Sequence, residues 1–207
     1  MEERKQFNSA VLYAAVLFGF FFLCRAGEYV RSGPSDGRET RGMDVKLSVD
    51  KGVRRVDIQF RKTKTDQKAF GCTKTQYEVD GANEVEVCVV QALHWLREWV
   101  PERFAGREAG LPLFRWQGGR PVRREHVQAL LQRAAEAVGL PRERFKAHSL
   151  RIGGASALLH ATGEFDLVKR FGRWNSDAVH GYLHESAQQY QGLSTKMARD
   201  RSSVHYT

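Results

Sequence analysis

The sequence contains little cysteine and no repeated or low-complexity segment. Its three cysteines, Cys24, Cys72 and Cys88, are far apart, odd in number and form no C-x-x-C pair. This pattern argues against a disulfide framework and a cysteine-rich zinc site, and it is typical of a reducing, intracellular compartment. The 207 residues suffice for one large domain or two small ones.

Common phosphate-loop and zinc-protease motifs are also missing. Gly153 and Gly154 follow Arg151, but no G-x-x-x-x-G-K-[ST] loop is present, and close helix packing explains small residues at these positions. His180 and His184 are spaced to share one helix face, yet H-E-x-x-H is absent and the sequence suggests no third zinc ligand. We therefore expect no metal and no cofactor.

Long hydrophobic runs are scarce, and one stands out at residues 10–24. These fifteen residues carry no charge and lie between Lys5 and Arg25. A membrane span needs about 20 apolar residues, and no small-residue cleavage site follows, so a membrane span or signal segment is the weaker alternative. The run instead predicts a buried helix over residues 5–29.

Acidic residues are too few to balance the basic ones. The chain has 33 Lys and Arg against 24 Asp and Glu, giving a net charge of +9, and its hydrophobic fraction of 42% is enough for a sizeable core. A basic surplus of this size favours a polyanionic partner, either nucleic acid or an acidic membrane face. Charge alone does not choose between these partners.

The residue pattern predicts a mainly α fold with a small antiparallel β-sheet, an α+β class. Alternating residues predict a hairpin of strands at Met43–Val49 and Val53–Phe60 around the turn at 50–52, with a third strand near Thr75–Val79. Helical periodicity predicts helices over 84–100, Arg123–Val138, Ser149–His160 and Phe165–Phe171. Residues 101–121 are expected to form a long connection, and the polar stretch from Ser176 onward is compatible with helix.

Four short stretches carry residues suited to phosphoryl transfer from DNA. They read LCRAGEYV, RKTKTDQ, AHSLRIGGASAL and GRWNSDAVHGYLH, and their candidate residues are Arg25, Lys64, His148, Arg151, Trp174 and Tyr182. Two guanidinium groups can clamp one phosphodiester, and an indole N–H can add a further hydrogen bond. A lysine can protonate the leaving oxygen, a histidine can accept the nucleophile's proton, and a tyrosine can form a covalent phosphoester. This set supplies its own positive charge and needs no metal.

These motifs resemble those of the tyrosine recombinase (phage integrase-like) catalytic domain. The phrases KTKTDQ, HSLRIGGASAL and GRWNSDAVHGYL carry the resemblance, which extends from about residue 10 to 190 in family order and is closest to eukaryotic retroelement and crypton-type recombinases. The resemblance implies a mostly helical fold with a small antiparallel sheet. It also implies that residues 1–190 form the catalytic domain, that the family's N-terminal core-binding domain is absent, and that the protein is nuclear if eukaryotic and otherwise cytoplasmic.

The resemblance also implies a role for each candidate residue. Arg25 matches the first catalytic arginine, and His148 with Arg151 match the H-x-x-R pair. Trp174 occupies a position that is histidine in many members and tryptophan in some. From its type alone, however, a tryptophan at this position is more often a core residue.

Two of the implied assignments have a competitor nearby. Lys64 matches the hairpin lysine that protonates the 5′-hydroxyl leaving group, and Lys62 is the competing lysine. Tyr182 matches the nucleophile that forms a 3′-phosphotyrosyl intermediate. Many family members place this tyrosine nine residues after the histidine or tryptophan position, whereas the gap here is eight, so Tyr190 is the alternative nucleophile.

The sequence therefore predicts a site-specific DNA recombinase or integrase catalytic domain from a mobile element. Its expected partners are double-stranded DNA and further copies of itself in a tetramer, and no membrane. Residues 191–207, with Lys196, Arg199 and Arg201, are interpreted as a tail that docks on a neighbouring protomer. Two alternatives are a catalytically inactive DNA-binding relative and a type IB topoisomerase-like enzyme that relaxes DNA.

Overall fold

The computed structural model describes residues 2–35, 37–61, 71–79 and 87–175. Within them the chain forms helices and one three-stranded antiparallel sheet, in the strand order β1-β2-β3. The helices are α1 (Glu2–Phe21), α2 (Val89–Trp99), α3 (Arg124–Ala137), α4 (Ser149–Thr162) and α5 (Phe165–Gly172), and the strands are β1 (Val45–Asp50), β2 (Val53–Phe60) and β3 (Cys72–Tyr77). The predicted class, mainly α with a small antiparallel sheet, is confirmed.

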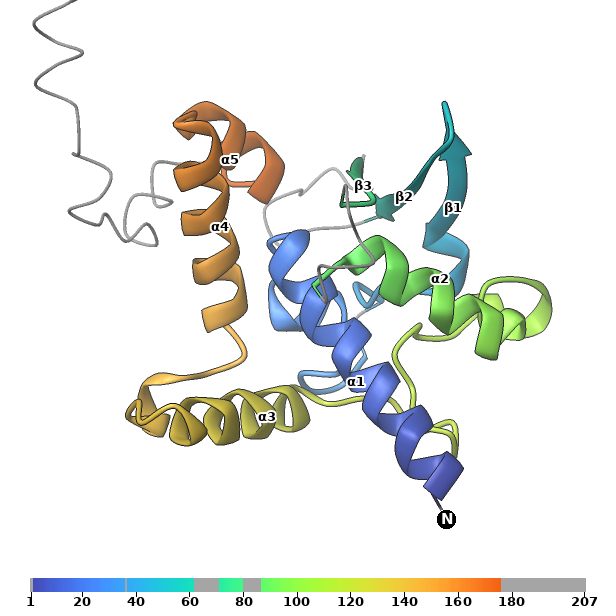
Figure 1. The fold of residues 1–207 in the computed structure, drawn as a ribbon. Coiled ribbons are helices and arrows are strands. Elements are labelled where there is room, and N and C mark those ends of the chain that lie inside the picture. The colour runs from blue at the N-terminus through green and yellow to red at the C-terminus, as the bar shows by residue number, and fades with distance from the viewer. Residues whose placement is uncertain (1, 36, 62–70, 80–86, 176–207) are drawn as a thin grey trace, which may run out of the picture.

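Helix α1 is the central element, and the other helices and the sheet are arranged around it (Figure 1). It contacts α2, α3 and α4, and its residues Val11, Ala15 and Phe18 are fully buried. The Phe18 ring lies against the rings of Tyr29 and Phe114, which ties the helix to the turn that follows it and to the connection before α3. The uncharged run is thus a buried helix, and none of the helices in the described residues is long and apolar enough to cross a membrane.

Helix α1 ends eight residues before the predicted boundary at residue 29. Leu23 adopts a left-handed conformation with φ of 50°. The N–H of Cys24 donates to the carbonyl of Gly19 at 3.0 Å, and the N–H of Leu23 donates to Phe20 at 3.2 Å. These two bonds form a Schellman-type helix end, which usually has glycine at the left-handed position. Because leucine stands there instead, hydrophobic periodicity continued past the true end of the helix.

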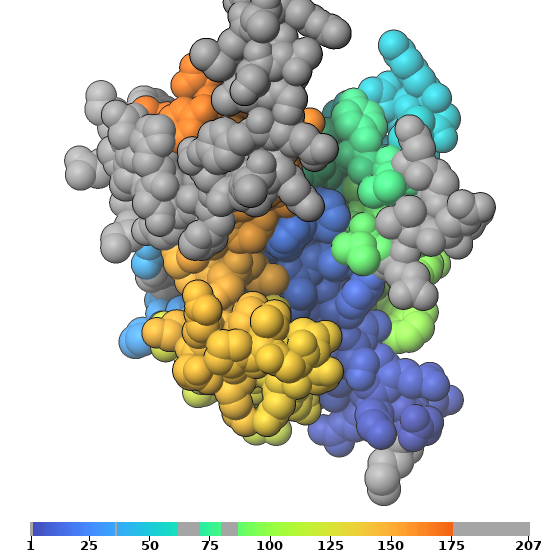
Figure 2. Space-filling view, turned by 60° about the vertical axis from the view of Figure 1, so that its left-hand side comes forward, coloured from blue at the N-terminus to red at the C-terminus, as the bar shows by residue number. Residues whose placement is uncertain are grey.

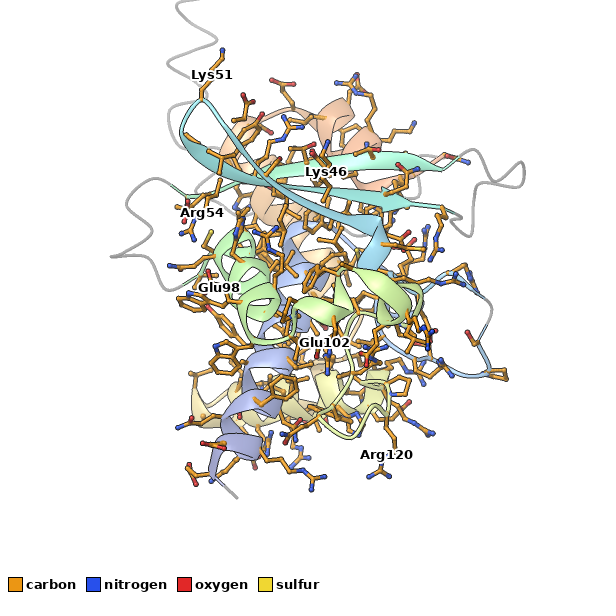
Figure 3. All side chains as sticks on the ribbon, turned by 90° about the vertical axis from the view of Figure 1, so that its right-hand side faces the viewer. Lys46, Lys51, Arg54, Glu98, Glu102 and Arg120 are labelled. Carbon is orange, nitrogen blue, oxygen red and sulfur yellow. The ribbon has the colours of Figure 1, made fainter. Side chains whose placement is uncertain are left out.

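The sheet confirms the predicted hairpin. Strands β1 and β2 pair from Asp50 opposite Val53 to Val45 opposite Ile58. The two connecting residues, Lys51 and Gly52, have φ values of 51° and 84°, as a two-residue turn between antiparallel strands requires. Lys51 stands at the tip of this hairpin (Figure 3). Strand β3 begins three residues earlier than predicted, at Cys72, and pairs antiparallel to β2.

The predicted helices of the C-terminal half are confirmed to within about two residues. The connection before α3 contains two short 3-10 turns, η3 (Pro101–Arg103) and η4 (Gly106–Gly110). It is held in place by main-chain bonds, from Leu113 N–H to Thr40 O and from Arg31 N–H to Val122 O, both at 2.9 Å. The connection is therefore ordered although it has little regular structure.

Helix α4 packs closely against the end of α1 because it has a glycine at the contact. A Cβ atom at Gly154 would lie 2.2 Å from the carbonyl oxygen of Phe20 and 2.7 Å from the Leu23 side chain. The two helices lie side by side in the space-filling view, where α4 is orange and α1 is blue (Figure 2). This contact brings the start of α4 to the turn that follows α1.

Candidate active site

Arg25 lies in the turn after α1 and is oriented by an acidic residue three positions later. It precedes the 3-10 turn η1 (Ala26–Glu28). Its main-chain N–H donates to Oε2 of Glu28 at 2.8 Å, and its Nη1 donates to Oε1 of Glu28 at 3.3 Å. About a quarter of the Arg25 side chain stays exposed, whereas Glu28 is buried. Glu28 therefore orients Arg25, and part of the Arg25 side chain stays accessible to solvent.

Arg151, in the first turn of α4, is almost completely buried, with 1% of its surface exposed. Its Nη1 donates to the carbonyl of Leu23, and its Nη2 donates to the carbonyl of Gly172 at 2.8 Å. Burial, followed by the charge of Arg25, lowers the pKa of Arg151 to about 10. Arg151 remains positively charged at neutral pH and joins the ends of α1, α4 and α5.

Trp174 is both a core residue and a partner of Arg151. Its ring is 7% exposed and packs with the buried side chains of Leu23, Ala155 and Val168. The guanidinium carbon of Arg151 lies 3.9 Å from the centre of this ring, which is cation–π geometry. The core interpretation and the site interpretation of Trp174 are thus compatible.

His148 directly precedes α4 and lies half-buried beside the two arginines. Its side chain makes no capping hydrogen bond to the described first turn of the helix. Burial, then Arg151 and then Arg25 lower the pKa of His148 below its usual value. The imidazole is therefore neutral at pH 7 and can accept a proton.

Sequence reasoning missed two residues that complete this cluster, Glu28 and Arg173. Nη2 of Arg173 donates to Oε2 of Glu28 at 2.7 Å, and both side chains are at least 95% buried. Burial acts to raise the pKa of Glu28, but Arg173 and then Arg151 outweigh it and the pKa is lowered. Both residues adjoin recognised motif positions, in RAGE and GRW, so their neighbourhood was a signal that could have identified them.

Lys74 is a further cation near this cluster that the sequence did not single out. It lies on β3, half-buried, and its Nζ donates to the carbonyl of Arg170 at 2.9 Å. Burial is the main cause that lowers its pKa, with Arg173 and Arg170 adding to the effect. The prediction considered only lysines of the basic segment before β3, because only those match the family motif.

The structure therefore brings together four of the six predicted residues, namely Arg25, His148, Arg151 and Trp174. The other two, Lys64 and Tyr182, lie outside the described residues. The same holds for the competitors Lys62 and Tyr190, for His180 and His184, and for the predicted tail at 191–207. Within the described ranges, no three His, Cys, Asp or Glu side chains are grouped as a metal site would require.

Comparisons with known proteins give similarity at the level of structure. No protein-family model and no curated protein matches the chain. The chain is similar to XerH site-specific recombinase in a post-cleavage complex with a palindromic difH substrate, with a TM-score of 0.59 and 17% identity over 96% of this chain. It is also similar to XerH in a pre-cleavage complex with difH, with a TM-score of 0.55 and 17% identity over 94% of this chain. XerA recombinase matches with a TM-score of 0.55 and 18% identity over 97% of this chain.

These matches span only part of the recombinases, 52% of the XerH chain and 63% of the XerA chain. At such low identity the similarity concerns the path of the backbone rather than the activity. The chain has the fold of a tyrosine recombinase catalytic domain.

Proposed function

We propose that this chain is the catalytic domain of a site-specific tyrosine recombinase or integrase, of the kind found in mobile elements of the crypton type. The observation that carries the proposal is the meeting of Arg25, His148 and Arg151 beside Trp174. These residues come from three segments far apart in sequence, and the charges of both arginines act on His148. A structural role alone does not require two arginines and a histidine at one place.

The described residues would bind and orient one phosphodiester of double-stranded DNA. Arg25 and Arg151 supply two positive charges, which match the charge that a phosphate develops in the transition state. The ring of Trp174 packs against the Arg151 guanidinium and so fixes its position. His148, neutral at pH 7, accepts the proton of the attacking hydroxyl.

Lys64 and Tyr182 complete the reaction in this proposal, by the resemblance of their motifs. The Tyr182 oxygen attacks phosphorus and its proton passes to His148. The bond from phosphorus to the 5′-oxygen breaks as Lys64 protonates that oxygen, leaving a 3′-phosphotyrosyl bond and a free 5′-hydroxyl. Attack by the 5′-hydroxyl of another strand reverses the step, and four protomers on DNA would exchange strands in this way.

Covalent capture tests the proposal. The probe is a pool of nicked DNA duplexes of randomised sequence, in which the short 5′-hydroxyl fragment diffuses away after cleavage and leaves the adduct trapped. We expect a complex that resists denaturing gel electrophoresis. Tyr182→Phe should abolish this complex while a native gel shift persists, because the ring is retained and only the nucleophilic oxygen is lost.

Tyr190→Phe is the matched control, since it makes the same change eight residues further along the chain. It should leave the adduct intact. If Tyr190→Phe abolishes the adduct and Tyr182→Phe does not, the nucleophile is Tyr190. If the wild-type chain forms no adduct with any duplex in the pool, the recombinase proposal is wrong.

A DNA-binding relative without activity is the second candidate, and one observation favours it. Arg151 is only 1% exposed, and both of its terminal nitrogens donate to main-chain carbonyls, as expected of a residue that holds helices together. Such a module would shift DNA in a native gel and leave no adduct with the nicked duplexes. The same experiment therefore separates the two candidates.

A further inference from the structure

The buried ion pair of Glu28 and Arg173 connects several parts of the candidate site. Oε2 of Glu28 accepts from both the Arg25 N–H and Nη2 of Arg173, while Oε1 accepts from Nη1 of Arg25. Nη1 of Arg173 donates to the carbonyl of Phe22 at 3.1 Å. The Arg173 guanidinium carbon also lies 3.9 Å from the ring centre of Phe60, the last residue of β2.

Arg173 adopts a conformation that arginine rarely takes. Its φ is 64°, in the left-handed region at the end of α5. Such a conformation is unfavourable for a residue with a Cβ, so other contacts of Arg173 must compensate for it. The Arg173 side chain extends to Glu28 rather than into solvent, and only 8% of the residue is exposed.

The charges of the cluster explain what this pair contributes. The Glu28 carboxylate lies 3.3 Å from Nη1 of Arg25 and 2.7 Å from Nη2 of Arg173. The shorter of these two ion pairs is therefore the one with the buried arginine. Burial raises the pKa of the neighbouring Cys24 thiol to about 12, so Cys24 adds no charge. With Arg173 present, the cluster of Arg25, Arg151, Arg173 and Glu28 carries a net charge of +2, and without Arg173 it would carry +1.

We propose that Arg173 is a positioning residue that neutralises Glu28, so that Glu28 orients Arg25 without cancelling its charge. Without Arg173, the buried carboxylate would have Arg25 as its nearest cation and would draw that side chain inward. The guanidinium of Arg25 would then be less available to a phosphate. The effect on phosphate binding rests on the proposed recombinase function, whereas the geometry of the Glu28–Arg173 pair does not depend on it.

The first experiment needs no activity, because His148 reports on the charge of Arg25. Burial, then Arg151 and then Arg25 lower the pKa of His148. In Arg173→Gln we expect the NMR titration of His148 to move to higher pH, since Glu28 would now offset the charge of Arg25. Arg115→Gln is the matched control, because Arg115 is likewise buried and bonds to Glu108 at 2.6 Å far along the chain. An unchanged His148 titration in Arg173→Gln, or an equal change in Arg115→Gln, would overturn the inference.

The second experiment measures adduct formation with a duplex captured by the wild-type protein. Arg173→Gln should slow adduct formation by about 100-fold, the usual cost of losing one transition-state hydrogen bond or charge. On the same duplex with a methylphosphonate at the cleaved position, which lacks the negative charge, the loss should be much smaller. An equal loss on both duplexes indicates general damage to the fold and contradicts the inference.

Two further variants separate positioning from structural support. Arg173→Lys keeps the charge and should recover most of the rate. Adding Glu28→Gln to Arg173→Gln removes the carboxylate that traps Arg25, so the double variant should be faster than Arg173→Gln alone. If the double variant is slower, Glu28 does not trap Arg25 and the inference fails. A wild-type chain without adduct would refute the recombinase function, and the His148 titration would still decide the role of Arg173.

Discussion

Arg151 shows how the chain accommodates a charge in its interior. Burying a guanidinium without partners is costly, because water no longer solvates the charge. Here the carbonyls of Leu23 and Gly172 accept hydrogen bonds from it, and the Trp174 ring lies against its face. The carbonyl of Leu23 belongs to a residue with φ of 50°.

The lowered pKa of His148 predicts how stability depends on pH. Because folding holds this pKa down through burial and two arginines, the unfolded chain binds the proton more readily. Its contribution to stability is therefore complete above the ordinary histidine pKa of about 6.5 and is lost as pH falls from that value through the lowered pKa of the folded state. We expect the melting temperature to drop between pH 7 and pH 5, and His148→Gln to flatten this drop.

His94 provides the comparison for this measurement. Burial, followed by Arg54, also lowers the pKa of His94, so part of the acid destabilisation should persist in His148→Gln. His160→Gln is the control variant, because His160 is exposed on α4. If His148→Gln and His160→Gln show the same dependence as the wild-type chain, His148 does not titrate as the structure indicates.

Residues of the candidate site could be predicted where they occupy a position of a recognised motif. They were missed where only a contact in the folded structure identifies them. Arg25, His148, Arg151 and Trp174 were identified because their types and order match a phosphate-binding set. Glu28 and Arg173 matter through a buried contact between segments that are 145 residues apart. Both residues lie within the quoted motifs, but no local pattern encodes the contact between them, so the sequence predicted the proposed phosphate-binding cations and not the ion pair beside them.

At the scale of elements, the contact between α4 and the end of α1 sets the site, and Gly154 tests it. A methyl group at Gly154 would lie 2.2 Å from the Phe20 carbonyl, a main-chain atom that can move only with the helix. Gly154→Ala should therefore destabilise the protein by about 1–3 kcal/mol, as overpacked sites do. The measurement is urea denaturation, and covalent capture should fall in parallel because Arg151 would shift away from Leu23.

Gly153→Ala is a control one position earlier in the same helix. Its methyl group would lie 3.5 Å from the Phe20 ring, an ordinary contact. Alanine also favours helix over glycine by about 1 kcal/mol, so Gly153→Ala should be neutral or stabilising. Equal effects from the two variants would show that α4 does not approach α1 through Gly154.

Elements were predicted well where hydrophobic periodicity dominates and poorly where helix ends depend on tertiary contacts. The hairpin turn at Lys51 and Gly52 and the helix starting at Ser149 follow from local residue types. The end of α1 does not, because the chain turns at a leucine, whose carbonyl accepts a hydrogen bond from Arg151 far along the chain. A helix boundary of this kind depends on contacts with residues far along the chain.

At the scale of the whole molecule, the positive charge is not spread evenly. The face that carries α2 and the sheet shows Glu98 and Glu102 together with basic residues, so it carries charges of both signs (Figure 3). The exposed segment that leads directly into His148 is different in character. It contains Arg142, Arg144 and Lys146, and its described acidic neighbours are Glu143 and Glu136, which lies 3.5 Å from Nη1 of Arg142. This segment is therefore the stronger candidate for contacts to the DNA backbone.

The salt dependence of binding tests this distribution of charge. Each phosphate contact that is lost should reduce the slope of log K against log salt by about 0.9. Removing two contacts, in Arg142→Gln with Arg144→Gln, should thus reduce the slope by about 2.

The control pair is Arg107→Gln with Arg120→Gln, two exposed arginines of the connection before α3. Both double variants lower the net charge from +9 to +7, so only contacts at the site distinguish them. A fluorescence anisotropy titration between 50 and 200 mM salt measures the two slopes, and equal slopes would place the DNA elsewhere on the protein.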